Sequence, residues 1–166
     1  MNLTPVLAFV GYSNTGKTTL IERLIVSLKE RGIRVAAVKH DAHEFDIDCK
    51  GKDSWRFSQA GAVAAMISSP TKSALVIHQE LSLTQVLSLL PDVDLILVEG
   101  YKAEPLTKIG VCRPSIGKSL PLDSDQCLAV ITDDKNMPIS VPCFGFEELP
   151  AITEFILQNM EHISQL

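Results

Sequence analysis

The sequence has few cysteines and no long apolar run. Its 166 residues include only four cysteines, which are widely separated and form no C-x-x-C pair. This usage is typical of reduced thiols in a cytosolic protein and does not indicate a disulfide framework. No stretch approaches the roughly 18 to 20 apolar residues of a membrane span, and no basic region followed by a long apolar segment opens the chain. We therefore expect a cytoplasmic protein that does not enter a membrane.

The sequence also lacks an excess of basic residues. It has 15 lysines and arginines against 20 aspartates and glutamates, for a formal net charge of −5. A chain of this charge does not attract nucleic acid or anionic membranes over a broad surface. Any affinity for phosphate must therefore be local, and the expected ligand is a small molecule or a partner protein.

One stretch matches a phosphate-binding motif at every fixed position. Residues 11–18, GYSNTGKT, fit the P-loop pattern G-x-x-x-x-G-K-[ST]. An apolar strand is predicted over residues 6–10 and an amphipathic helix over residues 19–28. The loop then lies between a strand and the start of a helix, where backbone N–H groups and the helix dipole attract phosphate.

Each residue type in this loop has a chemical reason. Gly11 and Gly16 allow the backbone to curl closely around an anion, where a Cβ would clash or force a strained φ. Lys17 would reach the β- and γ-phosphates of a nucleotide, and the Thr18 hydroxyl would bind Mg²⁺. The loop therefore predicts a nucleotide and Mg²⁺ as ligands.

Strands and helices alternate along the rest of the chain. Strands are predicted at 33–39, 93–98, 108–113, 127–131 and 143–145, and helices at 53–60, 82–90 and 147–163. Two further apolar runs, at 62–67 and 73–77, are separated by a short segment containing a proline, which favours an antiparallel hairpin.

This order predicts one α/β domain over residues 1–166, with the three-layer fold of P-loop NTPases and a mixed, mostly parallel sheet. In such sheets the ligand lies outside the carboxyl ends of the strands. The P-loop, the segment 40–53, Glu99 and Asp133 all follow predicted strands. We expect these four stretches to meet at one edge of the sheet.

Two acids compete for the role of the Mg²⁺ partner. Asp94 begins an apolar strand and Glu99 ends it. The five positions from one to the other would span roughly 17 Å, so only one of the two can face the P-loop. Because ligands lie at carboxyl ends, we predict Glu99, and the alternative is an acid that is merely solvated at a strand end.

The segment 40–53 is acidic and contains two histidines. Its carboxylates, among them Asp41 and Asp53, could bind Mg²⁺ or position water beside a nucleotide. His40, His43 and Cys49 offer a soft transition-metal site instead, although H-x-x-H with one distant cysteine is no recognised zinc spacing. A solvated polar loop is the third interpretation.

Asp133 follows the strand predicted at 127–131. Many GTP-binding proteins carry an aspartate in this position that accepts hydrogen bonds from guanine N1 and the exocyclic amine. The order T-D-D-K at 132–135 differs from the usual N-K-x-D. The predicted preference for guanine therefore rests on position alone.

Several short motifs in a fixed order are more specific than the P-loop by itself. K-H-D at 39–41, G-K-D-S at 51–54 and V-E-G-Y-K at 98–102 follow it in turn. From about residue 6 to residue 102, the sequence resembles the molybdopterin-guanine dinucleotide biosynthesis protein B family. The likeness is looser toward the C-terminus.

The resemblance implies a GTP-binding protein, usually a homodimer, that assists the nucleotidyltransferase joining GMP to molybdopterin. Molybdopterin itself is a further candidate ligand. By position the resemblance assigns Mg²⁺ to Thr18 and Glu99, and it leaves Asp41 and Asp53 as catalytic candidates of second rank. The nucleotide-binding positions that it implies are Gly11, Ser13, Asn14, Thr15, Gly16, Lys17, Thr18 and Thr19.

The sequence also predicts slow turnover. No arginine stands in an obvious finger position and no glutamine lies next to Glu99, whereas such charge-stabilising groups contribute about 10³ to 10⁵ in the rate of GTPases. At most a slow Mg²⁺-dependent GTPase is expected. Three other functions stay open: a small-molecule kinase or ATP-dependent synthetase, a metallochaperone-like GTPase, and a scaffold with an idle P-loop.

Overall fold

The computed structural model describes residues 4–40 and 47–166. The chain forms two compact units, the first made of Met1–His40 and Pro91–Leu166 and the second of Asp41–Leu90. None of the helices among the described residues is both long and apolar enough to cross a membrane.

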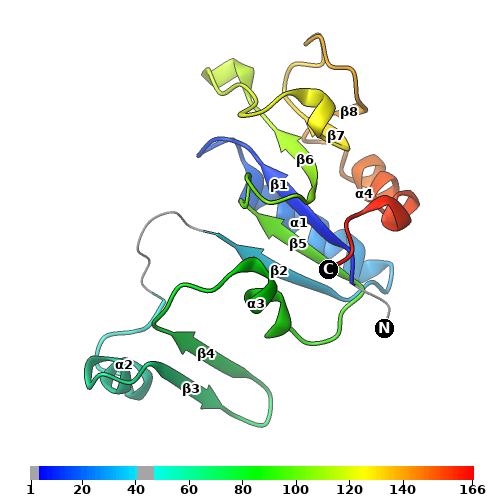
Figure 1. Cartoon of the computed structure of the whole chain (residues 1–166). Coiled ribbons are helices and arrows are strands. Elements are labelled where there is room, and N and C mark those ends of the chain that lie inside the picture. The colour runs from blue at the N-terminus through cyan, green and yellow to red at the C-terminus, as the bar shows by residue number, and fades with distance from the viewer. Residues whose placement is uncertain (1–3, 41–46) are drawn as a thin grey trace. The chain divides into compact units, whose positions relative to one another are not determined.

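The first unit is built on a six-stranded sheet with the strand order β2-β5-β1-β6-β7-β8. Each of the strand pairs in this sheet is parallel (Figure 1). The strands are β1 Val6–Val10, β2 Val35–Lys39, β5 Leu95–Glu99, β6 Thr107–Val111, β7 Ala129–Ile131 and β8 Cys143–Phe144. All five residues of β1 are buried, as expected for a central strand of a parallel sheet.

Two helices pack together on one face of this sheet. α1 spans Lys17–Glu30 and α4 spans Leu149–Gln158. Leucines of α1 and isoleucines of α4 join side chains of β1, β5, β6 and β7 in the largest hydrophobic cluster. The predicted closing helix, 147–163, was too long at both ends. Pro150 lies in the first turn of α4 and begins the helix instead of interrupting it, and after Gln158 a separate 3-10 helix follows at Met160–His162.

A second hydrophobic cluster holds the loops that follow β6 and β7. Cys112, Cys127 and Val130 are its buried members. The side chains packed against them come from the two loops and are Leu120, Leu122, Met137, Ile139 and Val141. These contacts give fixed positions to segments that carry polar residues at the sheet edge.

The second unit contains two short helices and a hairpin. Its elements are α2 Asp53–Gln59, β3 Ala64–Ser68, β4 Ser73–Ile77 and α3 Leu83–Ser88. β3 and β4 pair antiparallel, so the predicted hairpin is confirmed. It forms a two-stranded sheet of its own, and the antiparallel pair is therefore not an edge of the larger sheet. Ser82 and Gln85 form a capping box at the start of α3.

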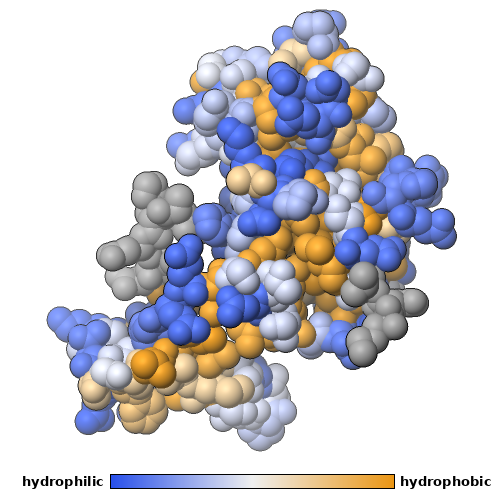
Figure 2. Space-filling model, viewed as in Figure 1, coloured by the Kyte–Doolittle hydropathy of each residue, from blue (hydrophilic) through white to orange (hydrophobic). Residues whose placement is uncertain are grey.

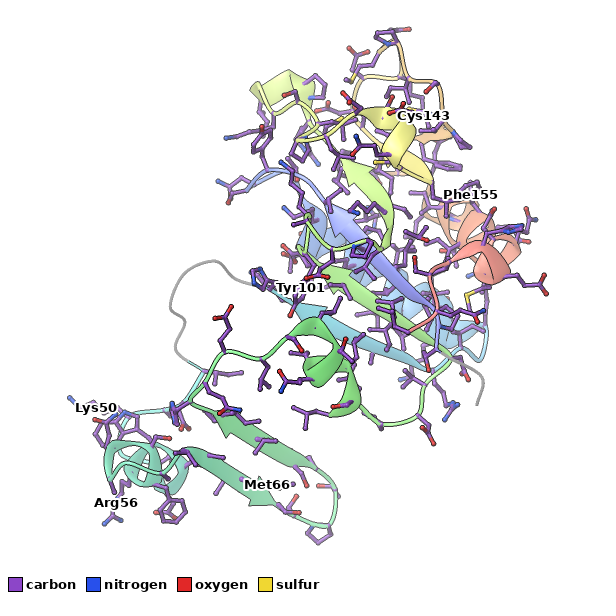
Figure 3. All side chains as sticks on the ribbon, viewed as in Figure 1. Lys50, Arg56, Met66, Tyr101, Cys143 and Phe155 are labelled. Atoms are coloured by element: carbon purple, nitrogen blue, oxygen red, sulfur yellow. The ribbon has the colours of Figure 1, made fainter. Side chains whose placement is uncertain are left out.

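The hairpin exposes an unusual amount of apolar surface for an isolated two-stranded sheet. Val63 is 80% exposed, Met66 60%, and Ile67 and Leu75 43% each. Figure 2 shows this apolar surface over the hairpin, and Figure 3 labels Met66 on β3. A single hairpin is at best marginally stable in water. Burial of this apolar surface against another surface would therefore stabilise it.

Candidate functional site

The P-loop connects β1 directly to α1. Asn14 has φ 65° and Gly16 has φ 94°, so the loop turns through two left-handed residues before the helix begins. Thr15 is fully buried, and its hydroxyl donates to the carbonyl oxygen of Tyr12 at 3.0 Å. The predicted curled loop is thus present and is held from the inside by its own threonine.

Gly11 is required for a reason that the sequence did not indicate. A Cβ at this position would lie 2.2 Å from the carbonyl oxygen of Val111 on β6. Backbone atoms of two paired strands cannot move apart without breaking the sheet. Gly11 therefore allows β6 to approach the start of the phosphate loop, and the left-handed Gly16 makes the turn itself.

The start of α1 leaves its backbone donors free for a ligand. Gly16 is the N-cap residue, and it makes no side-chain cap hydrogen bond. The first turn of a helix has N–H groups without intrahelical partners, and here they belong to Lys17, Thr18 and Thr19. These groups, together with the helix dipole, offer donors and positive charge to an anion at the N-terminus of a 14-residue helix.

Lys17 lies over the loop, where its Nζ donates to the carbonyl oxygen of Tyr12 at 2.9 Å. Burial lowers the pKa of Lys17, the nearby Glu99 carboxylate opposes this effect, and Lys39 adds to it. A bound phosphate would supply the negative charge that favours the protonated amine. The side chain thus lies over the loop, and its contact with a phosphate stays a prediction.

Glu99 and Thr18 meet in space although 81 positions separate them. The Thr18 hydroxyl donates to Oε2 of Glu99 at 2.8 Å. Both groups are oxygen donors, which is the ligand type that Mg²⁺ prefers, and Mg²⁺ at nucleotide sites needs only one or two protein ligands besides phosphate. The residues present therefore fit this ion.

Asp94 lies at the opposite end of β5, as predicted from strand length. Its carboxylate accepts hydrogen bonds from the backbone N–H and the guanidinium of Arg34, with an ion-pair distance of 2.8 Å. These hydrogen bonds from Arg34 lower the pKa of Asp94. Asp94 is thus a structural acid, engaged in joining the starts of β2 and β5.

The chain just after β5 is tightly held. Gly100 has φ 101° and Tyr101 has φ 50°, and a Cβ on Gly100 would lie 3.1 Å from the carbonyl oxygen of His40. The N–H of His40 donates to the carbonyl oxygen of Glu99 at 2.9 Å. The Tyr101 ring, labelled in Figure 3, lies 4.5 Å from the His40 ring between centroids. This packing gives the backbone beside Glu99 a defined position.

On the other side of β1, Asp133 follows β7 as predicted. Its side chain is exposed, and one carboxylate oxygen accepts a hydrogen bond from the Ser115 hydroxyl. The following residue, Asp134, donates its N–H to the Thr132 hydroxyl at 3.1 Å. Asp133 therefore lies at the same sheet edge as the P-loop, because the carboxyl ends of parallel strands share an edge.

Sequence reasoning missed Arg113 and Phe146. The Arg113 guanidinium carbon lies 4.2 Å from the centroid of the Phe146 ring, and Nε donates to the carbonyl oxygen of Thr15 at 3.4 Å. Both residues stand two positions beyond a strand, β6 and β8 respectively. The rule that selected Glu99 and Asp133, a polar or functional side chain just after an apolar strand, could have found them too.

Other predicted residues are not brought to this site by the described contacts. Asp41 and His43 lie outside the described residues. Asp53 belongs to the second unit, where its carboxylate pairs with Arg56 at 3.7 Å. Its role beside a nucleotide stays a prediction.

The soft-metal set of His40, His43 and Cys49 is only partly described, because His43 lies outside the described residues. Cys49 is an exposed residue of the second unit, whereas His40 belongs to the first. Within residues 4–40 and 47–166, no group of three or more His, Cys, Asp and Glu side chains is arranged to hold a metal ion.

Comparisons with known proteins agree on one family. The family described as "Molybdopterin guanine dinucleotide synthesis protein B" matches residues 6–133. The molybdopterin-guanine dinucleotide biosynthesis adapter protein of Haemophilus influenzae is 36% identical over 97% of this chain and 92% of its own length. The protein with the same description from Escherichia coli is 34% identical over 96% of this chain and 95% of its own length.

Solved structures show the same similarity. The crystal structure of Bacillus subtilis MobB has a TM-score of 0.76 at 25% identity and covers 94% of this chain and 98% of its own. A crystal structure described as molybdopterin-guanine biosynthesis protein B has a TM-score of 0.68 at 33% identity, with 94% of this chain and 99% of its own covered. The predicted P-loop type of α/β fold is thereby confirmed.

Proposed function

The chain belongs to the molybdopterin guanine dinucleotide synthesis protein B family, and from this we propose that it is a GTP-binding adapter in molybdenum cofactor biosynthesis. It would assist the attachment of GMP to molybdopterin by a guanylyltransferase partner. The observation that carries the proposal is the contact between Thr18 and Glu99 at the start of α1. In this contact a hydroxyl and a carboxylate, two oxygen donors that suit a nucleotide-bound Mg²⁺, lie beside an open helix N-terminus.

In this function the loop holds the phosphates. The residues that would contact the nucleotide are Gly11, Ser13, Asn14, Thr15, Gly16, Lys17, Thr18 and Thr19. Thr18 and Glu99 would hold Mg²⁺, which when bound neutralises charge on the β- and γ-phosphates. Lys17 would exchange its hydrogen bond with the Tyr12 carbonyl oxygen for one with a phosphate oxygen.

The order of strands gives the nucleotide a direction. β5, with Glu99 at its end, lies on one side of β1, whereas β6, β7 and β8 lie on the other. Because Mg²⁺ accompanies the β- and γ-phosphates, the base would extend toward β7. The exposed Asp133 carboxylate stands there and would accept hydrogen bonds from guanine, with Ser115 orienting it.

We infer that turnover is slow and that the protein acts by holding GTP for its partner. Asp41 and Asp53 are the remaining candidates for positioning water. We place the protein in the cytoplasm, where its partner enzyme and GTP are found. Molybdopterin is a further ligand that the partner complex could bring to it.

The apolar hairpin supports a homodimer. Met66 and Leu75 pair across β3 and β4 and are both exposed, so one face of the hairpin offers a continuous apolar surface (Figure 2). A second copy would bury the same surface in a two-fold interface. This would stabilise a hairpin that has little stability by itself.

The decisive experiment compares thermal stabilisation by GTP, ATP and GDP, each with Mg²⁺, in wild type and Lys17→Ala. A ligand that binds the folded state raises its melting temperature in proportion to RT ln(1 + [L]/Kd). We expect the largest shift with GTP and none in the variant. Equal shifts with ATP would instead support a kinase or synthetase, and no shift with any nucleotide would support an idle P-loop.

A further inference from the structure

Arg113 bridges the phosphate loop and the segment that follows β8. Its guanidinium is stacked on the face of the Phe146 ring at 4.2 Å, and its Nε donates to the carbonyl oxygen of Thr15 at 3.4 Å. A Cβ on Gly16 would lie 3.3 Å from its Nη2. The side chain thus lies against the two residues at which the loop turns into α1.

The backbone that carries Arg113 is rigid. Its N–H donates to the carbonyl oxygen of Lys118 at 2.7 Å, and its own carbonyl oxygen accepts from the Lys118 N–H at 3.1 Å. The turn between them contains a short 3-10 helix, Pro114–Ile116, and a left-handed Gly117. A cation held on such a turn can restrain a neighbouring loop, because little of its own freedom remains to be lost.

Phe146, on which Arg113 stacks, is in turn held by a side chain of α1. Arg23 of α1 donates from Nη1 to the carbonyl oxygen of Phe146 at 3.1 Å and pairs with Glu147 at 3.3 Å. The ring under Arg113 is therefore fixed to the helix whose N-terminus faces the phosphates. Thr15, Arg113, Phe146, Arg23 and α1 form a closed circuit of contacts around the second half of the P-loop.

No carboxylate among the described residues forms an ion pair with Arg113. Arg23, Arg34 and Arg56 each pair with a carboxylate, whereas Arg113 has no ion pair among residues 4–40 and 47–166. An uncompensated cation beside a phosphate loop, in a chain with a net charge of −5, favours an anion at that place.

We infer that Arg113 is a positioning residue for the nucleotide, which holds the Thr15–Gly16 backbone in its phosphate-binding form and adds positive charge near the phosphates that GTP and GDP share. This inference rests on the proposed GTP-binding function. Arg113 follows β6, on the opposite side of β1 from Glu99 and β5. It therefore acts away from the γ-phosphate, and its role differs from that of an arginine finger.

The test measures Kd for GTP and GDP, each with Mg²⁺, by titration calorimetry on wild type, Arg113→Ala, Arg113→Met and Arg113→Lys. We expect alanine and methionine to weaken both nucleotides by the same factor of about ten, the order of one hydrogen bond from a charged group. Lysine, which keeps the charge and can still stack on the ring, should recover affinity to within about threefold of wild type. Arg31→Ala, at the far end of α1, is the matched control and should bind both nucleotides as wild type does.

A second variant tests the circuit. Phe146→Leu keeps apolar bulk and removes the ring face, so it should weaken both nucleotides by about threefold, as expected for an exposed cation–π contact. The double variant with Arg113→Ala should bind no more weakly than Arg113→Ala alone, because both changes break the same contact. Melting temperatures without nucleotide identify any variant that is merely unfolded, and Arg113→Met with its apolar stem is expected to fold.

Four results would overturn the inference. If wild type binds both nucleotides and Arg113→Ala and Arg113→Met bind them equally well, the inference is wrong but the proposed function stands. The same holds if these variants lose affinity for GTP only. Failure of Arg113→Lys to bind better than Arg113→Met would show that charge has no part in it. Wild-type protein that binds neither nucleotide would overturn the proposed function, and this inference with it.

Discussion

Replacing Glu99 by glutamine separates the hydrogen bond that its carboxylate accepts from Thr18 from the Mg²⁺ binding proposed for it. Without nucleotide, the carboxylate accepts a hydrogen bond from Thr18 at 2.8 Å, and the glutamine carbonyl oxygen can accept the same bond. A hydrogen bond to a charged group is stronger than a neutral one by about 1 kcal/mol. For a chain of 166 residues, this predicts a melting temperature lower by about 2–4 °C.

The effect on nucleotide binding is expected to be larger. At a GTP·Mg²⁺ concentration of about 100 Kd, wild type gains about 2.7 kcal/mol, or about 5–11 °C. Loss of a carboxylate that contacts a metal or its ligand typically weakens metal binding 10- to 100-fold. A tenfold weakening alone would reduce the gain to about 1.4 kcal/mol, or about 3–6 °C.

The assay is a thermal-shift titration of GTP in the presence of Mg²⁺ and again in the presence of EDTA. With EDTA, wild type and Glu99→Gln should respond alike, because the difference between them lies in the metal. Asp94→Asn is the matched control, since it neutralises the acid at the other end of the same strand. It should lower the melting temperature without nucleotide, by loss of the exposed pair with Arg34, and leave the gain with GTP·Mg²⁺ unchanged.

Two results would refute the assignment. One is an equal Mg²⁺-dependent gain in Glu99→Gln and in wild type. The other is loss of that gain in Asp94→Asn, which would show that the ends of β5 have been assigned the wrong way round.

Three further predictions concern other parts of the molecule. Asp133→Asn should weaken GTP about tenfold or more and leave ATP unchanged in competition binding, because the amide cannot accept both guanine hydrogen bonds. Met66→Lys should convert a dimer to a monomer in light scattering, whereas Val26→Lys, at an equally exposed position of α1, should not. Hydrogen bonding from the Gly145 N–H, and then from Lys135, lowers the pKa of Glu148 in the folded protein. The stabilisation from these contacts is therefore present above the unfolded-state pKa of Glu148 and is lost as pH falls through its folded-state pKa. Glu148→Gln should flatten the acid side of the curve of melting temperature against pH.

The sequence was most informative where the chemistry is local. The phosphate loop is eight consecutive residues between a strand and a helix, so its pattern contains most of the information that forms it. The choice of Glu99 over Asp94 also needed no tertiary information, because the length of one strand puts its ends too far apart to share a site. The capped α3 and the hairpin at β3–β4 followed from turn and cap residues within a few positions.

The sequence was least informative about which strands are neighbours. The apolar runs of β3 and β4 predicted a hairpin, but only strand pairing shows that they form a sheet separate from the six parallel strands. The start of α4 was a separate uncertainty. The apolar pattern near Pro150 fits a helix that the proline interrupts and a helix that it begins equally well, and the structure shows the second.

The phosphate-loop motif at residues 11–18 and the place of an acid at position 99, at the carboxyl end of its strand, were thus determined by the sequence alone, because both follow from residues close together in the chain. Only the tertiary structure shows that Arg113 and Phe146, 33 positions apart, are in contact beside the P-loop. It also shows that Gly11 is needed because the carbonyl oxygen of Val111, at the end of β6, leaves no room for a Cβ. It also placed Glu99 and Asp133 on opposite sides of β1. The physical reason is that these contacts depend on the order and register of parallel strands. Long-range pairing and packing set that order and register, so no local sequence pattern predicts them.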